Sequence, residues 1–482
     1  MYKVKETEAN TYSKQNNRWL ALTVVCMASF MTMLDSFIVN VAVPSIQEDL
    51  QATSAEIQFV IISYILSYGV LLITGGRLGD IYGVKKMFIT GMAGFTIASL
   101  LCGIASTVEL LIVSRILQGI AAALMVPQVI SYIQVAFPLQ ERQFALTIYG
   151  AVIGIATVFG QIAGGILLKF DLFELGWRSI FLINIPIGLL ALVAAVSSIQ
   201  LRVELTYERI DLSGVSLLSL SLLLFMFPVV IGRELGWPYW TFVCFVLSIV
   251  IFLLFLYHEK KLTLHGGNPL IHLTLLKDRA FTIGLSIVFA FFSGNAATFF
   301  ILSFYLQESL RFTALEAAFA YTPLGIGFLG GSLLVPKISS RFGDGVLRFG
   351  SVLMVLGISS MMATIYFLAP TINWQAIIPA MFVSGIGQGF VATPLIRTIL
   401  SQIKTRETGM ASGLLSTVTV IAQGVGVSLI GTLYFSLMTS VVPSPSESTY
   451  SFTISLLCIL CLALVTGVLL FLLPGKQDKI KN

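Results

Sequence analysis

The chain has 482 residues, of which 57% are apolar and only 11% are Asp, Glu, Lys or Arg. Soluble domains carry about 25% charged residues, so a water-soluble globule of this length would lack the charge to cover its surface. The net charge of +5 comes from Lys and Arg residues spread in ones and twos, which does not indicate a nucleic-acid partner. These numbers argue against a soluble enzyme.

Apolar runs of roughly 18 to 25 residues recur along the chain, long enough for helices to cross a hydrocarbon core of about 30 Å. The alternating ten-residue segments of an outer-membrane barrel do not occur in the sequence. We therefore expect an all-α integral membrane protein with fourteen transmembrane helices. The predicted spans are residues 19–43, 56–78, 87–105, 109–136, 144–168, 179–200, 212–232, 240–257, 281–307, 315–337, 347–368, 375–400, 408–440 and 451–473.

The basic residues predict the orientation of these spans. An even number of spans places both chain ends on one side of the membrane. Of the 28 Lys and Arg, two lie more than two residues inside a span (Arg115 and Arg397), and few lie in the segments on the side opposite the termini: Lys169, Arg178, Arg233 and Arg311. The positive-inside rule therefore predicts a plasma-membrane protein with cytoplasmic N and C termini.

The sequence also repeats itself. Val113–Gly119 (VSRILQG) in the fourth span returns as Val383–Gly389 (VSGIGQG) in the twelfth. Such a repeat predicts two pseudo-symmetric six-helix bundles that face each other across a cavity, which is typical of transporters. The expected organisation is a cytoplasmic tail (1–18), an N-terminal bundle (19–200), two inserted helices (201–258), a cytoplasmic loop (259–280), a C-terminal bundle (281–473) and a second tail (474–482).

Asp35 is the one acid well inside a span. Burying a charge there costs about 3 kcal/mol on insertion scales, so intramembrane acids usually face a cavity and a partner. Asp35 lies about eight residues before the end of the first span, and Arg115 about six residues after the start of the antiparallel fourth span. We expect a water-facing pair at which a proton and a cationic substrate compete. A merely structural tie between the two helices remains the alternative.

Residues 75–86 (GGRLGDIYGVKK) lie between the second and third spans. Glycines allow a tight reversal, and basic residues hold it at the inner leaflet, so a simple polar turn is one interpretation. The string closely resembles the inner-loop signature of the major facilitator superfamily. The resemblance implies that Asp80 latches one bundle against the other and that the segment gates alternation through Gly75, Arg77, Gly79, Asp80, Gly83, Lys85 and Lys86.

Two further segments resemble the fourteen-helix drug:proton antiporter branch of that superfamily: Leu34–Pro44 (LDSFIVNVAVP) and Trp177–Gly188 (WRSIFLINIPIG). Arg115–Gly119 resembles the fourth-span signature, in which the Arg is linked to proton movement. The resemblance covers nearly the whole chain. It implies export of amphipathic, lipophilic and often cationic compounds by alternating access, driven by protons without a cofactor. We expect a monomer surrounded by lipid.

The fifth span departs from this family pattern. Gly154–Gly165 resembles the antiporter signature, but Gln161 stands where a proline is expected. This leaves open a proton-coupled transporter of one endogenous metabolite or lipid, and a non-transporting sensor or scaffold is a third interpretation. Gly160, Gly164 and Gly165 permit close helix packing.

Other polar side chains within spans are candidates for lining a cavity. Three histidines recur every seven residues, at His258, His265 and His272, but without cysteines or clustered carboxylates nearby in the sequence they predict no metal site. No nucleotide-binding loop or Ser/His arrangement indicates an enzyme. The cavity candidates are Asn40, Tyr64, Tyr68, Gln118, Gln128, Gln161, Asn295, Gln388 and Gln423.

Overall fold

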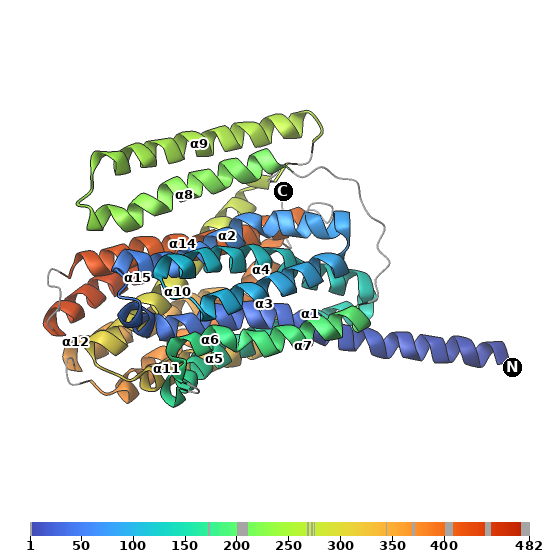
Figure 1. The fold of residues 1–482 in the computed structure, drawn as a ribbon, viewed down its shortest axis with the longest axis horizontal. Helices are drawn as coiled ribbons and strands as arrows, with labels where there is room; N and C mark the ends of the chain where they lie inside the picture. Colours follow the sequence, from blue (N-terminus) through green and yellow to red (C-terminus); the bar gives the residue numbers. More distant parts are fainter. Residues whose placement is uncertain are drawn as a thin grey trace.

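The computed structural model describes residues 2–171, 174–199, 211–267, 269–270, 273, 275–343, 345–368, 372–400, 408–438 and 445–473. These residues are mostly helical, and Figure 1 shows the helices packed side by side, with α8 and α9 as a layer along one flank. Within the described residues, fourteen helical stretches are long and apolar enough to cross a membrane. The predicted fold class is confirmed.

The N-terminal half supplies six of these stretches. They are α1 (Tyr2–Asp49), α2 (Ser54–Tyr82), α3 (Val84–Gly103), α4 (Val108–Ala136), α5 (Leu139–Phe170) and a broken sixth span made of η2 (Gly176–Arg178), α6 (Ser179–Leu182) and α7 (Asn184–Ser198). Pro186 explains the break, because its ring removes a backbone donor in the first turn of α7.

The inserted pair is α8 (Leu212–Glu234) and α9 (Tyr239–Leu264). The C-terminal half follows, with η3 (Leu275–Lys277), α10 (Arg279–Phe304), the π-helical turn η4 (Tyr305–Ser309), α11 (Ala314–Phe342), α12 (Gly345–Leu368), η5 (Trp374–Ile377), α13 (Ile378–Leu400), α14 (Thr408–Ser436) and α15 (Pro445–Leu472).

One predicted boundary differs from the structure. The helix α9 runs to Leu264, beyond the predicted start of a loop at residue 259, because Glu259 is buried inside the protein instead of lying in solvent. The helix α1 begins at Tyr2 and extends past the bundle through the predicted tail, and its membrane-spanning stretch begins at Arg18, next to the predicted start at residue 19 (Figure 1). The linker 201–210, the tail 474–482 and His272 lie outside the described residues.

The repeat is visible in how equivalent helices begin. At α2, the Thr53 hydroxyl accepts a hydrogen bond from the Glu56 amide at 3.3 Å, and the Glu56 carboxylate accepts one from the Thr53 amide at 2.8 Å. The same capping box forms at α11 between Thr313 and Glu316, with the same two distances. Each box satisfies two backbone donors that the first helical turn leaves unpaired.

The repeated glycine motif explains helix packing in both halves. A Cβ on Gly119 of α4 would lie 2.5 Å from the Tyr64 carbonyl oxygen of α2, and a Cβ on Gly389 of α13 would lie 2.4 Å from the Phe328 carbonyl oxygen of α11. Only glycine permits such close backbone approach. The pairs α2–α4 and α11–α13 are therefore the tight cores of the two bundles.

The two bundles meet along two seams, α2 against α14 and α5 against α11. The helix α8 packs on both α2 and α14, so the inserted pair covers the first seam, as Figure 1 also shows. Thr432 of α14 donates to the Val229 carbonyl of α8 at 3.2 Å, and Phe59 of α2 lies 5.6 Å from Phe227, ring to ring. Ser221 and Ser248 exchange hydrogen bonds at 3.0 and 2.8 Å and hold α8 to α9.

Hydrogen bonds also join the two bundles at one end of the molecule. We call the end that contains Arg18 and the connections α2–α3 and α4–α5 the basic end, and the opposite end the far end. At the far end Ser303 donates to the Asn40 carbonyl, Gln307 donates to the Val41 carbonyl at 3.0 Å, and the hydroxyl of Thr432 donates to Gln58 at 3.4 Å. The described conformation is closed there.

Candidate functional site

Asp35 of α1 and Arg115 of α4 form an ion pair in the middle of the N-terminal bundle. The predicted contact is therefore present. The two side chains are 0% and 1% exposed, so the pair is shut off from solvent in this conformation. A buried pair of this kind is tolerated only when its remaining donors and acceptors are also satisfied.

Neighbouring amides complete the network around Asp35. Gln118 donates to Asp35 Oδ1 at 2.8 Å and accepts from Arg115 Nη1 at 2.7 Å. Asn184, at the break between α6 and α7, donates to the same Asp35 oxygen at 3.3 Å. Gln118 also donates to the Ser99 hydroxyl at 2.9 Å, which brings α3 into the network. Four spans thus converge on one carboxylate.

Arg115 is held on its other sides by α2. Its Nε donates to the Val60 carbonyl at 3.2 Å, and its guanidinium carbon lies 4.2 Å from the centre of the Tyr64 ring. Tyr64 stacks on Tyr68 with ring centres 6.1 Å apart. The positive charge therefore rests on an aromatic face as well as on a carboxylate, which lowers the cost of burying it.

The prediction that Asp35 faces water is wrong for this conformation. Phe37, two residues further along α1, contacts Phe299 of α10 across the space between the bundles, with ring centres 5.1 Å apart. Two residues turn a helix by about 200°, so Asp35 points the opposite way, into its own bundle. Residue counting predicted the depth of Asp35 but not the direction of its side chain, and it did not single out Ser99 or Asn184.

The C-terminal bundle has a neutral counterpart of this site. Asn295 of α10 donates to Gln388 of α13 at 2.7 Å, and Gln388 occupies the repeat position that corresponds to Gln118. Both amides line a small recess with Phe291, Thr298 and Met354. No basic side chain stands at the position equivalent to Arg115, which is Gly385. At this pair of repeat positions the charge therefore belongs to the N-terminal bundle.

The predicted gating segment is mostly helical. α2 extends to Tyr82 and α3 starts at Val84, so the chain reverses at Gly83, whose φ of 92° strongly favours glycine. Arg77 donates to the Pro269 carbonyl at 2.6 Å, in the connection that links the inserted helices to the C-terminal half. Asp80 is exposed. The segment thus contacts the connection between the two bundles directly.

The remaining residues of this segment are anchored locally. Lys85 donates to the Val196 carbonyl of α7 at 2.6 Å, and the Lys86 ammonium lies 5.4 Å from the Tyr82 ring centre. Gln128 of α4, a predicted cavity residue, is buried and donates to the Gly75 carbonyl at 2.9 Å. A Cβ on Gly79 would strike the same Gln128 amide.

Gln161 differs from the other cavity candidates. It is 3% exposed, and neither its amide oxygen nor its amide nitrogen has a hydrogen-bond partner among the described residues. Gly165, one turn later on α5, packs on Ala314 and Ala318 of α11, so this face of α5 meets the other bundle. Gly160 and Gly164 instead pack on α1, as predicted for helix packing. Asn40 is nearly buried, and Gln423 lies half-buried on α14.

A family model for the Major Facilitator Superfamily matches residues 25–427. The chain belongs to the Major Facilitator Superfamily. The predicted family is thereby confirmed, and this superfamily protein is a transporter, not an enzyme. Residues 75–86 and Arg115–Gly119, which resemble signatures of this superfamily, lie within the matched residues.

Curated relatives of this superfamily member include export and resistance proteins. It is 38% identical to a probable actinorhodin transporter of Streptomyces coelicolor, over 88% of this chain and 73% of the relative. It is 30% identical to the methylenomycin A resistance protein of Bacillus subtilis, over 86% of each chain. A crystal structure of tetrameric PepTSo2 shares the fold, with a TM-score of 0.66 and 13% sequence identity. The match covers 96% of this chain and 99% of that chain.

Proposed function

We propose that this transporter exports amphipathic, lipophilic and often cationic compounds across the plasma membrane in exchange for protons. The buried Asp35–Arg115 pair carries this proposal, because a lone intramembrane carboxylate held by a guanidinium and two amides is equipped to take up and release one proton. The relationship to an actinorhodin transporter and to a methylenomycin A resistance protein supports export of antibiotic-like compounds.

Coupling follows from the position of the pair inside the N-terminal bundle. Protonation of Asp35 removes its attraction for Arg115, which frees the guanidinium to move and loosens the contacts among α1, α4 and α7. A cationic substrate that approaches from the space between the bundles favours the ionised carboxylate and so expels the proton. The proton and the substrate then act on the same hydrogen-bonded network around Asp35, although they do not occupy the same position.

In this proposal, alternating access occurs by movement along the two seams between the bundles. We infer cytoplasmic termini, with Asp80 and its segment at the inner face, so the far end that Ser303 and Gln307 close would be the outer face. The described conformation then corresponds to an outward-closed state of a monomeric carrier in lipid. Rocking of one bundle against the other would break these far-end hydrogen bonds and expose the site outward.

The Gln161 side chain supports a second candidate, a transporter of one hydrogen-bonding metabolite. Its amide is buried and has no hydrogen-bond partner in the described part of the chain, and at the face of α5 that meets the other bundle it could bind a polar group of a substrate. A relative in Clostridioides difficile, 27% identical over 88% of this chain and 89% of the relative, is the riboflavin transporter RibZ.

The test is transport into proteoliposomes with an imposed pH gradient and a panel of lipophilic dyes. We expect Asp35→Asn to lower proton-driven transport at least tenfold, since the amide cannot exchange a proton. Glu48→Gln is the matched control, because Glu48 is an exposed acid on the same helix, and it should transport normally. Full coupled transport by Asp35→Asn would refute proton exchange at this carboxylate, and transport of one polar metabolite but no dye would favour the second candidate.

A further inference from the structure

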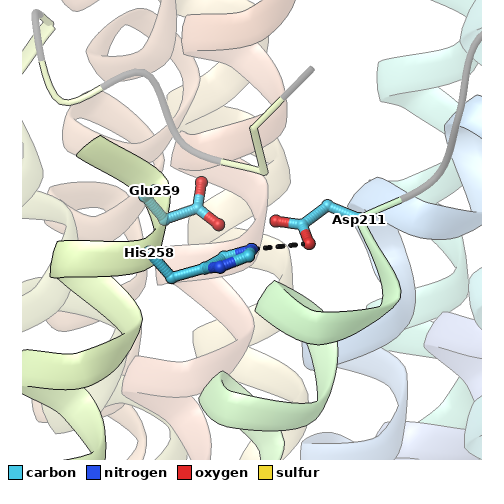
Figure 2. Close-up of side chains that lie close together, drawn as sticks. All are labelled: Asp211, His258 and Glu259. Carbon is cyan, nitrogen blue, oxygen red and sulfur yellow. Dashed lines mark hydrogen bonds and ion pairs between the residues drawn. The ribbon is translucent and has the colours of Figure 1, made fainter. Parts of the chain in front are cut away.

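The two inserted helices bring three metal-ligating side chains together at the basic end. Asp211 immediately precedes α8, whereas His258 and Glu259 lie near the end of α9. One ligand atom from each lies within 4.8 Å of the others, and His258 Nε2 is 2.9 Å from Asp211 Oδ1. Figure 2 shows the three side chains pointing toward one another from the two helices.

The two carboxylates of this cluster are buried next to each other. The side chain of Asp211 is 4% exposed and Glu259 is 0% exposed. Asp211 Oδ1 accepts hydrogen bonds from the Gly214 amide at 2.9 Å and from His258, but Asp211 Oδ2 is buried and accepts no hydrogen bond from a described backbone or side-chain donor. Buried carboxylates this close must share a proton or a cation.

Asp211 Oδ2 and Glu259 Oε1 converge on one place. A Cβ on Gly214 would lie 2.3 Å from Asp211 Oδ2 and 2.5 Å from Glu259 Oε1, so a glycine is needed for both oxygens to approach α8. The basic neighbours Lys260 and Lys261 on α9 are exposed to solvent, unlike the two carboxylates.

The donor set matches a transition metal. One imidazole nitrogen with two carboxylate oxygens is a ligand combination used for Zn²⁺, whereas Ca²⁺ and Mg²⁺ prefer oxygen ligands alone. Ligands about 2.0–2.2 Å from one zinc ion lie within about 4.4 Å of each other, so the cluster needs only small side-chain movements. His258 is 30% exposed, which leaves access for the ion and room for a water ligand.

We propose that Asp211, His258 and Glu259 form a binding site for one divalent transition-metal cation, with Zn²⁺ the best match. The ion would join the start of α8 to the end of α9. Because α8 covers the seam between α2 and α14, the ion would brace the helix pair that covers that seam, at its basic end. This site is separate from Asp35, so metal binding does not depend on the proposed transport reaction.

The test is calorimetric titration of Zn²⁺ alone into full-length protein in detergent, after chelator treatment and with its thiols blocked. The protein carries no polyhistidine tag, because the chain has only three histidines and a tag would bind more metal than the site. We expect one Zn²⁺ per chain. His258→Gln should weaken binding at least tenfold, and Co²⁺ added in place of Zn²⁺ should give a visible absorption band that His258→Gln abolishes.

His265→Gln is the matched control, because His265 is exposed in the following loop and its Nδ1 bonds the Lys261 carbonyl at 2.7 Å. It should bind Zn²⁺ like the wild type. A second variant, Glu259→Gln, can still donate a hydrogen bond to Asp211 and so preserves a structure that needs only a shared proton, yet it should lose affinity for Zn²⁺. Absence of stoichiometric binding in the wild type, or unchanged binding in His258→Gln, would overturn the proposal.

Discussion

Arg115 shows at the scale of one residue how a charge is kept inside the membrane part of the protein. Its guanidinium donates to the Asp35 carboxylate, the Gln118 amide oxygen and the Val60 carbonyl, and it rests on the Tyr64 ring. Each partner comes from a different turn or helix, so the charge is satisfied only when α1, α2 and α4 are assembled. The pair is therefore a structural tie as well as the proposed proton site.

This double role makes a prediction about stability. Arg115→Met leaves the Asp35 carboxylate buried without its countercharge, which typically costs about 3–5 kcal/mol. Asp35→Asn added to Arg115→Met removes that charge and should recover most of the loss. Thermal unfolding of the purified variants in detergent measures both effects. If the double variant unfolds at a temperature no higher than Arg115→Met, unpaired charge is not what destabilises the single variant.

The same residues show which parts of the site the sequence could predict. The contact between Asp35 and Arg115 followed from equal depth in antiparallel spans, which residue counting supplies. The direction of Asp35 depends on how α1 is rotated, and the cross-bundle contact of Phe37 sets that rotation. Asp211 was missed because it lies far along the chain from His258, and only the pairing of α8 with α9 brings them together.

At the scale of helices, close packing depends on a few glycines. Gly75 of α2 faces the α4 backbone, and a Cβ there would lie 1.8 Å from the Ala123 carbonyl oxygen. Gly76, the next residue, faces open space apart from Pro127, whose Cβ would lie 3.6 Å away. The two adjacent glycines therefore differ in whether the structure has room for a larger side chain.

We predict that Gly75→Ala destabilises the protein by about 1–3 kcal/mol or more, because α2 and α4 must separate to admit a methyl group. Gly76→Ala, its neighbour, should be neutral or stabilising by up to about 1 kcal/mol, since alanine favours the helix. Chemical or thermal unfolding in detergent compares the stabilities of the two variants. Equal unfolding midpoints for the two variants would contradict the packing inferred at Gly75.

The helices themselves were largely predictable, because an apolar run of span length has few alternatives to a membrane helix. The residues at which the helices begin and end were harder to predict. Glu259 looked like loop sequence, yet its contacts with the start of α8 keep it in α9. The sixth span forms one membrane-spanning stretch as predicted, but the sequence did not show that α6 and α7 would meet at Ile183, beside the Asn184 that reaches Asp35.

The whole molecule has two bundles, two seams and one inserted pair that covers a seam. The repeat in the sequence predicted the bundles, but it could not predict which helices meet, because contacts between halves do not repeat within either half. The far-end contacts are of this kind: Gln307 donates to the Val41 carbonyl at 3.0 Å and to the Ser303 hydroxyl at 3.0 Å, and Ser303 donates to the Asn40 carbonyl.

These far-end hydrogen bonds make a prediction about conformational equilibrium. Removing them with Ser303→Ala and Gln307→Ala together should favour opening of the far end by about 1–3 kcal/mol, a factor of roughly 5 to 150. The readout is the rate at which a maleimide labels Val41→Cys, in a chain whose 5 native cysteines are replaced. Val41 is buried, so its cysteine reacts only when the two bundles separate.

Ser436→Ala provides the comparison for this experiment. Ser436 is exposed near the same end, and its hydroxyl bonds the Leu433 carbonyl of its own helix at 2.8 Å, so its loss leaves the contact between bundles intact. Labelling should therefore accelerate in the double variant and stay unchanged with Ser436→Ala. Equal labelling in all three chains would mean that packing along the two seams, and not these polar contacts, keeps the far end closed.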